Sequence, residues 1–588
     1  MSDYRAPVME LAFVLKHVAG LDSVAALPGF DSLDDDLVTA ILDEAGRFSE
    51  ERVAPTNQQA DRQGTGLENR QVVTAPALDG LYQAYREGGW PGLTGDTAHG
   101  GQGLPQTLGF AVQEILQSAN TAFALLPMLT QGVITALGRY GSAEQQALYL
   151  PKLTSGEWAG TMNLTEPQAG SDLGQVKTRA EREGDHYRLF GQKIFITWGD
   201  QPYTDNIVHL VLARTPDAPA GVKGISLFIV PKFLVTAEGG IGERNDVYPI
   251  GVERKLGIHA SPTCTMAYGD NGGAIGYLVG DENQGLKYMF AMMNHARLAV
   301  GLQGVSLAER ACQHALGYAR ERLQGTRQDR GPVAIAEHPD VRRMVLTMQA
   351  LTQAGRALAL SAMHHFDHAT HSADDSERAR HQQRVDLLTP LVKGWCTEIV
   401  NEVTSLAVQV HGGMGFIEET GVAQYYRDAR ILAIYEGTNG IQALDLVGRK
   451  LLANGGEYAT DLLRDLRDIV GGCRAAGLDP LADRLEQALG LATDGVRATL
   501  TAAQGDPDYA GAVAFNLLML LGTSAAGCYL AKGAAKAAEL SAAEPAASTF
   551  YQRKIVVARV FAEQVLPRCL GYHQAVLAGG EALMAGEL

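Results

Sequence analysis

Residues 176–197 read VKTRAEREGDHYRLFGQKIFIT, and this stretch decides how the 588-residue chain is divided. Polar and apolar residues alternate in both halves, and Gly184-Asp185 separates the halves, which predicts a β-hairpin. Upstream, apolar residues recur three or four positions apart, as in LDDDLVTAILDEAGRFSEERV at 33–53, which is the amphipathic helix pattern. The period therefore changes from helical to strand-like near residue 161.

Further strand patterns occur at 207–214, 225–230, 263–268 and 274–279, and helical patterns resume at Gly285. We therefore predict an α+β multi-domain fold. The predicted parts are an N-terminal extension (1–34), an N-terminal helical domain (35–160), a central all-β domain (161–284), a C-terminal four-helix-bundle domain (285–450) and an additional C-terminal helical domain (451–588).

Composition restricts the partners and the compartment. A formal net charge of -17 argues against nucleic acid, because phosphate backbones are bound by clustered Lys and Arg. The six cysteines are widely spaced, which is typical of reduced thiols in a cytoplasmic protein. The first residues lack the pattern of a secretory signal, so we expect a cytoplasmic location. The uncharged stretch 509–531 contains polar Asn516, Thr523 and Ser524, which favours a buried bundle helix over a membrane span.

The hexapeptide IYEGTN at 434–439 contains a candidate general base. Glu436 stands between an aromatic residue and Gly437. Apolar neighbours raise the pKa of a carboxyl group, and the missing side chain of Gly437 leaves room for a substrate. The alternative is that Glu436 only pairs with a nearby arginine on a loop.

Two other segments support the interpretation of Glu436 as a catalytic base. They are TEPQAGSD at 165–172 and QVHGGMGF at 409–416. Together with the α, β, α order, they make the chain resemble the acyl-CoA dehydrogenase family over roughly residues 35–450. The long form, with its extra C-terminal helices, resembles a subfamily that acts in dimethylsulfoniopropionate breakdown. The resemblance implies FAD-dependent conversion of an acyl-CoA to the trans-2-enoyl-CoA, here 3-methylmercaptopropionyl-CoA to methylthioacryloyl-CoA.

The resemblance also implies roles for single residues. Glu436 corresponds to the base that takes the α proton, while flavin N5 receives the β hydride. Several residues depart from the family pattern, namely Gln168 in the flavin loop, Trp198 after Phe195-Ile196-Thr197, His259, Gln324 and Pro339. The implied cofactor contacts are Met162, Leu164, Thr165, Ser171, Phe195, Thr197, Arg322, Gln409, Gly412, Gly413, Thr438 and Asn439. The implied substrate contacts are Ser171, Met293, Asn294, Arg297 and Gly437.

Some of these contacts imply an oligomer. In relatives, residues matching Arg322 and the glycines of 409–413 reach the FAD of a neighbouring subunit, so we expect a homodimer or homotetramer. The expected electron acceptor is an electron-transferring flavoprotein. A dehydrogenase for other short- to long-chain acyl-CoAs, an acyl-CoA oxidase and a non-catalytic helical scaffold are the alternatives.

Three histidines, His364, His368 and His371, lie at i, i+4 and i+7, a spacing that can hold a divalent metal on one helical face. A polar loop follows them, and the implied chemistry needs no metal. We therefore predict a solvated helix end and no metal.

Overall fold

The computed structural model describes residues 4–327, 330–506 and 508–587. The chain divides into two compact units. One unit contains residues 48–104 and 119–296, and it holds the strands found in the described residues. The other contains the N-terminal segment through Arg47, residues 105–118 and residues 297–588, and it is helical. This arrangement confirms the predicted α+β class.

The strand-containing unit is built on one eight-stranded sheet, with the path β10-β11-β5-β12-β7-β6-β3 and with β4 paired to β5. The strands are β3 (Trp158–Asn163), β4 (Arg179–Glu183), β5 (His186–Thr197), β6 (Asn206–Ala213), β7 (Ser226–Pro231), β10 (Val247–Val252), β11 (Thr263–Tyr268) and β12 (Ala274–Leu278). The hairpin predicted at 176–197 is confirmed as β4 and β5, and Gly184 at its turn has a φ of +64°. Among the paired strands of the described residues, β3 pairs with β6 in parallel and the other pairings of this sheet are antiparallel.

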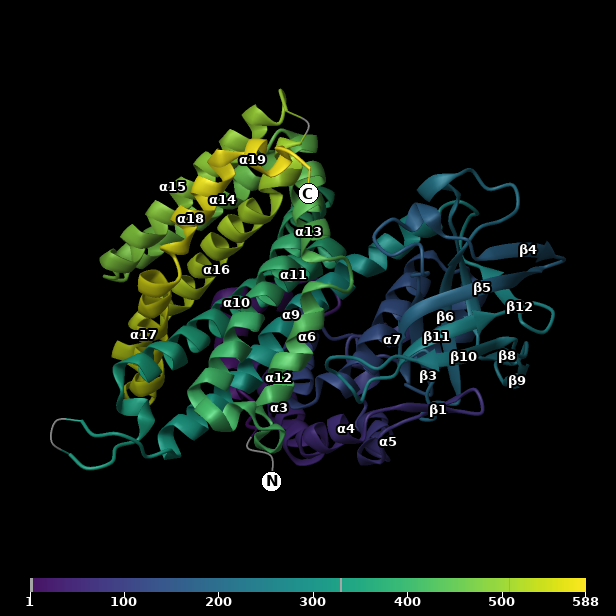
Figure 1. The fold of residues 1–588 in the computed structure, drawn as a ribbon, viewed down its shortest axis with the longest axis horizontal. Coiled ribbons are helices and arrows are strands. Elements are labelled where there is room, and N and C mark those ends of the chain that lie inside the picture. The colour runs from purple at the N-terminus through teal and green to yellow at the C-terminus, as the bar shows by residue number, and fades with distance from the viewer. Residues whose placement is uncertain (1–3, 328–329, 507, 588) are drawn as a thin grey trace. The chain divides into compact units, whose positions relative to one another are not determined.

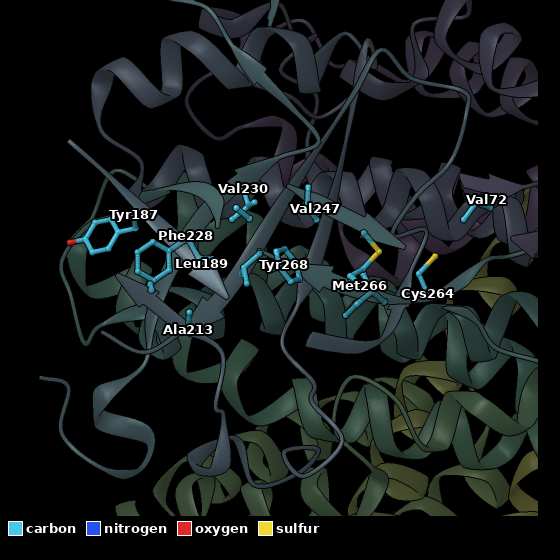
Figure 2. Close-up of a cluster of buried hydrophobic side chains, with 14 residues drawn as sticks. Val72, Tyr187, Leu189, Ala213, Phe228, Val230, Val247, Cys264, Met266 and Tyr268 are labelled. Atoms are coloured by element: carbon cyan, nitrogen blue, oxygen red, sulfur yellow. The ribbon is translucent and has the colours of Figure 1, made fainter. Parts of the chain in front are cut away.

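One face of this sheet forms a core of alternating side chains. Tyr187 and Leu189 of β5 pack with Phe228 and Val230 of β7 (Figure 2). Residues two apart on a strand point to the same face, so the period-2 pattern produces this cluster. The Tyr187 and Phe228 rings meet edge to face with their centroids 4.9 Å apart.

Several strands were missed by the sequence pattern. The change of period comes at Trp158, three residues before the predicted position, because β3 is buried along its whole length and so shows no alternation. The segment predicted as purely helical also contains the short hairpin β1 (Gly66–Glu68) and β2 (Gln71–Val73). β8 (Phe233–Val235), β9 (Ile241–Arg244) and β10 lie in turn-rich sequence. The helices of this unit are α4 (Asn57–Gln63), α5 (Leu81–Glu87), α7 (Thr121–Tyr140) and α8 (Ala143–Thr154).

The helical unit begins with α1 (Val8–Val14), α2 (Leu21–Ala25), α3 (Asp35–Phe48) and α6 (Gln106–Ala119). Most of α9 (Gly285–Glu321) belongs to it, followed by α10 (Pro339–His371), α11 (Asp375–His411), α12 (Val422–Ala429) and α13 (Asn439–Lys450). Small residues set the distance between these helices. A Cβ on Gly301 of α9 would lie 2.5 Å from Val392 of α11, so glycine lets the two backbones approach closely.

The C-terminal block comprises α14 (Glu457–Ala475), α15 (Asp479–Ala502), α16 (Tyr509–Ala543), α17 (Ser548–Gln564), α18 (Arg568–Ala578) and α19 (Glu581–Met584) (Figure 1). Helix α16 packs against α10, α11 and α13 as well as against α14, α15, α17 and α18. Two helices, α7 and residues 509–541 of α16, are long and apolar enough to cross a membrane, and 78% and 89% of their most apolar windows are buried. The predicted burial of 509–531 is therefore confirmed.

The histidines of α10 do not form the predicted solvated face. His371 is exposed and packs on Phe30, but His364 and His368 are half-buried. They contact His381, which lies on the next helix. Packing of α10 against α11 creates this environment, which the spacing within one helix could not indicate.

Candidate active site

Glu436 lies in the turn between a 3₁₀ segment (Arg430–Ala433) and α13. Its φ is +54°, and that of Gly437 is +85°. A left-handed conformation costs a non-glycine residue about 1–2 kcal/mol, and such strain gathers at functional sites. Thr438 caps α13, since its Oγ1 accepts a hydrogen bond from the Ile441 N–H at 3.2 Å. The cap fixes where the turn ends and holds Glu436 just before the helix.

The charge of Glu436 is set by burial and by two cations. Burial raises the pKa of the Glu436 carboxyl group, and the positive charges of Arg297 and Lys393 lower it in part. Among the described residues, no hydrogen bond or ion pair within 4 Å holds this carboxylate. The alternative of a simple arginine pair is therefore not what the structure contains, and the carboxylate is available to take a proton.

Arg297 is 5% exposed and lies on α9, with its Nη1 3.9 Å from Oδ2 of Asp445. Burial lowers the pKa of Arg297, while the Asp445 and Glu436 charges raise it. A guanidinium stays protonated in proteins, so the site has a permanent positive charge close to the candidate base.

Lys393 was missed by the sequence reasoning. It is fully buried in α11, and its Nζ donates to Oδ1 of Asn439 at 2.8 Å. Burial lowers the pKa of Lys393 to about 7, although the Glu436 charge opposes this change. The available signal was a single lysine inside the apolar run TPLVKGWC at 389–396. Because this ammonium titrates near neutral pH, it can adjust the charge around Glu436.

Asn439, predicted as a cofactor contact, has both ends of its amide occupied within the helical unit. Its Nδ2 donates to Oε1 of Glu398 at 2.7 Å and to Oγ1 of Thr397 at 2.9 Å, while its Oδ1 accepts from Lys393. This arrangement orients Lys393. Together with Thr438, Asn439 also lines a cavity of about 730 Å³ that includes Phe515 of α16.

Gln442 is a second residue that the sequence reasoning missed. It is buried, and its Nε2 donates to the carbonyl oxygens of Glu436 at 3.4 Å and Gly437 at 3.3 Å. A Cβ on Gly437 would lie 2.8 Å from that nitrogen and 3.7 Å from Nη2 of Arg297. Glycine at 437 is thus required both by its positive φ and by the neighbouring amide.

The strand-containing unit holds part of the predicted flavin contacts, and a β-bulge presents one of them, Phe195. Between Lys193 and Ile196 of β5 two residues oppose one residue of β11, so the ladder has an extra residue there. Phe195 in this bulge has a φ of +60° and is 59% exposed. An exposed aromatic ring on a rigid strand fits a planar ring system such as a flavin. Thr197, two residues on, is half-buried.

The loop 164–178 is anchored beside this bulge by a buried ion pair. The Nζ of Lys193 lies 2.8 Å from Oε1 of Glu166 and donates to the carbonyl of Leu164 at 2.9 Å. Burial raises the pKa of Glu166, but the Lys193 charge and several hydrogen bonds outweigh it and lower the value to about 2. The Ile194 N–H also donates to the carbonyl of Thr165 at 2.9 Å. Leu164 and Thr165, both half-buried, are therefore fixed against β5.

Two of the departures from the family pattern, Gln168 and Trp198, have structural reasons. Gln168 donates to Oε2 of Glu166 at 2.6 Å and to the carbonyl of Gln175 at 3.1 Å, so it stabilises the loop itself. Trp198 is fully buried, and its Nε1 donates to the carbonyl of Ala122 at 3.0 Å. It is a packing residue of this unit.

The remaining predicted contacts differ in exposure. Met162 and Met293 are buried, Asn294 is half-buried and Ser171 is exposed. Four of the predicted contacts in the helical unit are exposed, namely Arg322, Gln409, Gly412 and Gly413. A Cβ at either glycine would meet nothing within 4 Å. These four lie at the ends of α9 and α11, where a second protein chain or ligand can reach them.

Comparison with known families matches almost the whole chain. Residues 36–157 match "Acyl-CoA dehydrogenase, N-terminal domain", 161–270 the middle domain and 283–452 the C-terminal domain of the same family. Residues 462–587 match "Acetyl-CoA dehydrogenase C-terminal like".

Full-length relatives agree with these matches. The chain is 48% identical to the 3-methylmercaptopropionyl-CoA dehydrogenase of Ruegeria pomeroyi, over 100% of both chains. It is 34% identical to the broad-specificity linear acyl-CoA dehydrogenase FadE5 of Mycobacterium tuberculosis, over 96% of both.

Solved structures share the fold. Caenorhabditis elegans ACDH-11 in complex with C11-CoA has a TM-score of 0.77 at 20% identity, covering 96% of this chain and 92% of that one. The acyl-CoA dehydrogenase of Bacillus anthracis complexed with FAD has a TM-score of 0.73 at 24% identity, covering 96% and 91%. The chain belongs to the acyl-CoA dehydrogenase family and is an FAD-dependent enzyme of that family.

Proposed function

We propose that the enzyme converts 3-methylmercaptopropionyl-CoA to methylthioacryloyl-CoA, as a step of dimethylsulfoniopropionate breakdown, with Glu436 as the catalytic base. The identity of 48% over the full length of the Ruegeria pomeroyi enzyme supports the substrate. The observation that carries the base is the half-buried Glu436 carboxylate in a strained turn, whose pKa is influenced by the charges of Arg297 and Lys393.

The α proton of a thioester is weakly acidic, so the base must be strong and correctly placed. Burial gives Glu436 a raised pKa, while Arg297 and Lys393 keep its ionised form accessible. After Glu436 accepts the proton, the same two cations face a neutral carboxyl group. Bound FAD would supply the acceptor for the hydride that leaves the β carbon.

The flavin contacts are proposals. In the strand-containing unit, Thr165, Phe195 and Thr197 with the anchored loop would hold the isoalloxazine side, together with Met162, Leu164 and Ser171. In the helical unit, Thr438 is a further proposed cofactor contact. Arg322, Gln409, Gly412 and Gly413 would meet the FAD of a second subunit, which supports a homodimer or homotetramer. Met293, Asn294, Arg297 and Ser171 remain the proposed acyl-CoA contacts. We also propose a cytoplasmic location and an electron-transferring flavoprotein as the acceptor.

The test is anaerobic reduction of the bound flavin by a panel of acyl-CoAs. At equal concentrations, 3-methylmercaptopropionyl-CoA should reduce the flavin of wild type faster than butyryl-CoA or a long-chain acyl-CoA does. Glu436→Gln should keep FAD and bind the thioester, but reduce the flavin slower by ~10²–10⁴-fold or more. The control Glu539→Gln, an exposed residue paired with Lys536, should behave as wild type.

Near-normal reduction by Glu436→Gln would refute the assigned base. A clear preference for an unbranched fatty acyl-CoA would refute the substrate and leave the base intact. Substrate-dependent peroxide formation in air at the rate of turnover would identify an oxidase instead.

A further inference from the structure

Four histidines of the helical unit meet at one end of the α10–α11 pair. His364, His365 and His368 lie on the last two turns of α10, and His381 lies on the second turn of α11. Only residues 372–374 join the two helices, so these ends are held together. The ring centroids of His365 and His381 are 4.9 Å apart, and those of His368 and His381 are 4.5 Å apart.

Three of these rings present nitrogen atoms to one another. One ring nitrogen from each of His364, His365 and His381 lies within 4.8 Å of the other two. The Nδ1 atoms of His365 and His381 are 2.8 Å apart. A tetrahedral Zn²⁺ with Zn–N bonds of 2.0–2.1 Å needs ligand nitrogens about 3.3 Å apart. Small rotations of the rings bring the three nitrogens into that range.

The His364 ring is held by the N-terminal segment. Its Nδ1 is shielded from solvent, and the backbone of Gly20 makes a hydrogen bond to this ring. It lies beside Gly20, where a Cβ would be 3.8 Å from this nitrogen. A backbone contact of this kind fixes the orientation of a histidine ring, as outer-shell contacts do for metal ligands.

The surroundings of His381 have the form of a metal ligand's outer shell. Its Nδ1 faces His365, while its Nε2 lies 3.5 Å from Oε2 of Glu377. Metal-bound histidines usually direct their second nitrogen to a carboxylate, which fixes the tautomer.

His368 is held away from the ligand position. Its Nε2 lies 3.2 Å from Oγ of Ser23 in α2, and its Nδ1 lies 3.4 Å from Oγ of Ser372. A metal on the other three histidines would therefore take water as its fourth ligand. Arg380, Arg384 and Lys532 near the cluster oppose a bound cation. Arg380 is paired with Glu377 and Arg384 with Asp465, but Nη2 of Arg380 also lies 3.5 Å from Nε2 of His381.

We propose that His364, His365 and His381 form a site for a borderline divalent metal, with Zn²⁺ as the expected ion. Three imidazoles suit Zn²⁺ better than Mg²⁺ or Ca²⁺, which prefer oxygen ligands. The ion links the end of α10 to the start of α11 beneath the N-terminal segment. Its role is structural, since a ligand that binds only the folded state stabilises it.

The test uses full-length FAD-loaded enzyme without an affinity tag, stripped with a chelator and titrated with ZnCl₂. Wild type should bind one Zn²⁺ per chain and gain thermal stability. The double variant His365→Gln/His381→Gln should bind none at this site. The matched control His371→Gln removes an exposed histidine of the same helix and should still bind one Zn²⁺.

X-ray absorption of the zinc-loaded wild type tests the same site without any substitution. The expected spectrum has three imidazole nitrogens and one oxygen at about 2.0 Å. Absence of stoichiometric binding to wild type, retention of the site in the double variant, or a spectrum without imidazole would each overturn the proposal. Flavin content and turnover of the double variant show whether it has folded.

Discussion

Replacing Lys393 with methionine tests whether a buried ammonium controls the candidate base. Burial lowers the pKa of Lys393 from 10.5 to about 7 against the opposing charge of Glu436. Near neutral pH this lysine is therefore charged in only part of the molecules. Methionine keeps an unbranched apolar side chain in the cavity and removes only the charge.

The direction of the change in the Glu436 pKa follows from its opposite charge to Lys393. A charged Lys393 favours ionised Glu436, so its removal raises the pKa of Glu436. An opposite charge at close range lowers a carboxyl pKa by at least about 1 unit, equal to ~1.4 kcal/mol. In Lys393→Met the acid limb of the pH profile of kcat/KM should therefore move to a pH about one unit higher. At any pH on that limb, kcat/KM of the variant should be about tenfold lower than that of wild type. Well above pH 7 the two enzymes should converge, because Lys393 is then neutral in wild type.

Stability gives a second readout. The unfolded chain keeps a proton on Lys393 up to its ordinary pKa of 10.5, but the folded chain keeps it only below about 7. Wild type therefore loses stability as the pH falls through this interval, by up to ~1.4 kcal/mol per pH unit. Between about pH 9 and pH 7 the loss is about 2 kcal/mol. The advantage of Lys393→Met in Tm should be larger at pH 7 than at pH 9.

The assay is steady-state kcat/KM with a dye acceptor across neutral pH, with Lys536→Met as the matched control. Lys536 is paired with Glu539 on the surface, so its replacement should leave the profile unchanged. If Lys393→Met retains its flavin and shows the wild-type acid limb, the proposed control of Glu436 is wrong.

Gly437→Ala places a Cβ 2.8 Å from Nε2 of Gln442 at a φ of +85°, so kcat/KM should fall about 10–100-fold through strain of about 1–3 kcal/mol. Gly440→Ala, where the nearest atom is 3.7 Å away, should be near wild type, and equal losses in both would contradict this reasoning. Glu166→Gln leaves the Lys193 ammonium buried without its carboxylate, so a thermal melt should show a loss of about 3–5 kcal/mol and earlier FAD release. Adding Lys193→Met should recover part of that loss, and no recovery would exclude the unpaired charge as its cause.

The sequence by itself determined features that depend on neighbours along the chain. Alternation of side chains with Gly184 at the turn was sufficient for the β4–β5 hairpin, because a strand buried on one face needs a period of two. The IYEGTN segment indicated Glu436 as a candidate base, because the missing side chain of Gly437 leaves space beside it, and this assignment stays a prediction. The run at 509–531 was recognisable as a buried helix, because it has no charged residue but contains polar side chains.

Only the tertiary structure decided which distant residues meet. Lys393 on α11 contacts Asn439 on α13, and His381 meets the histidines of α10, yet neither pairing follows from spacing within one helix. The bulge that exposes Phe195 depends on the register of β11 against β5. Periodicity records whether a side chain is buried, but burial is satisfied by many partners. Which partner is present, and hence the pKa of each group, is fixed by how the helices and strands pack.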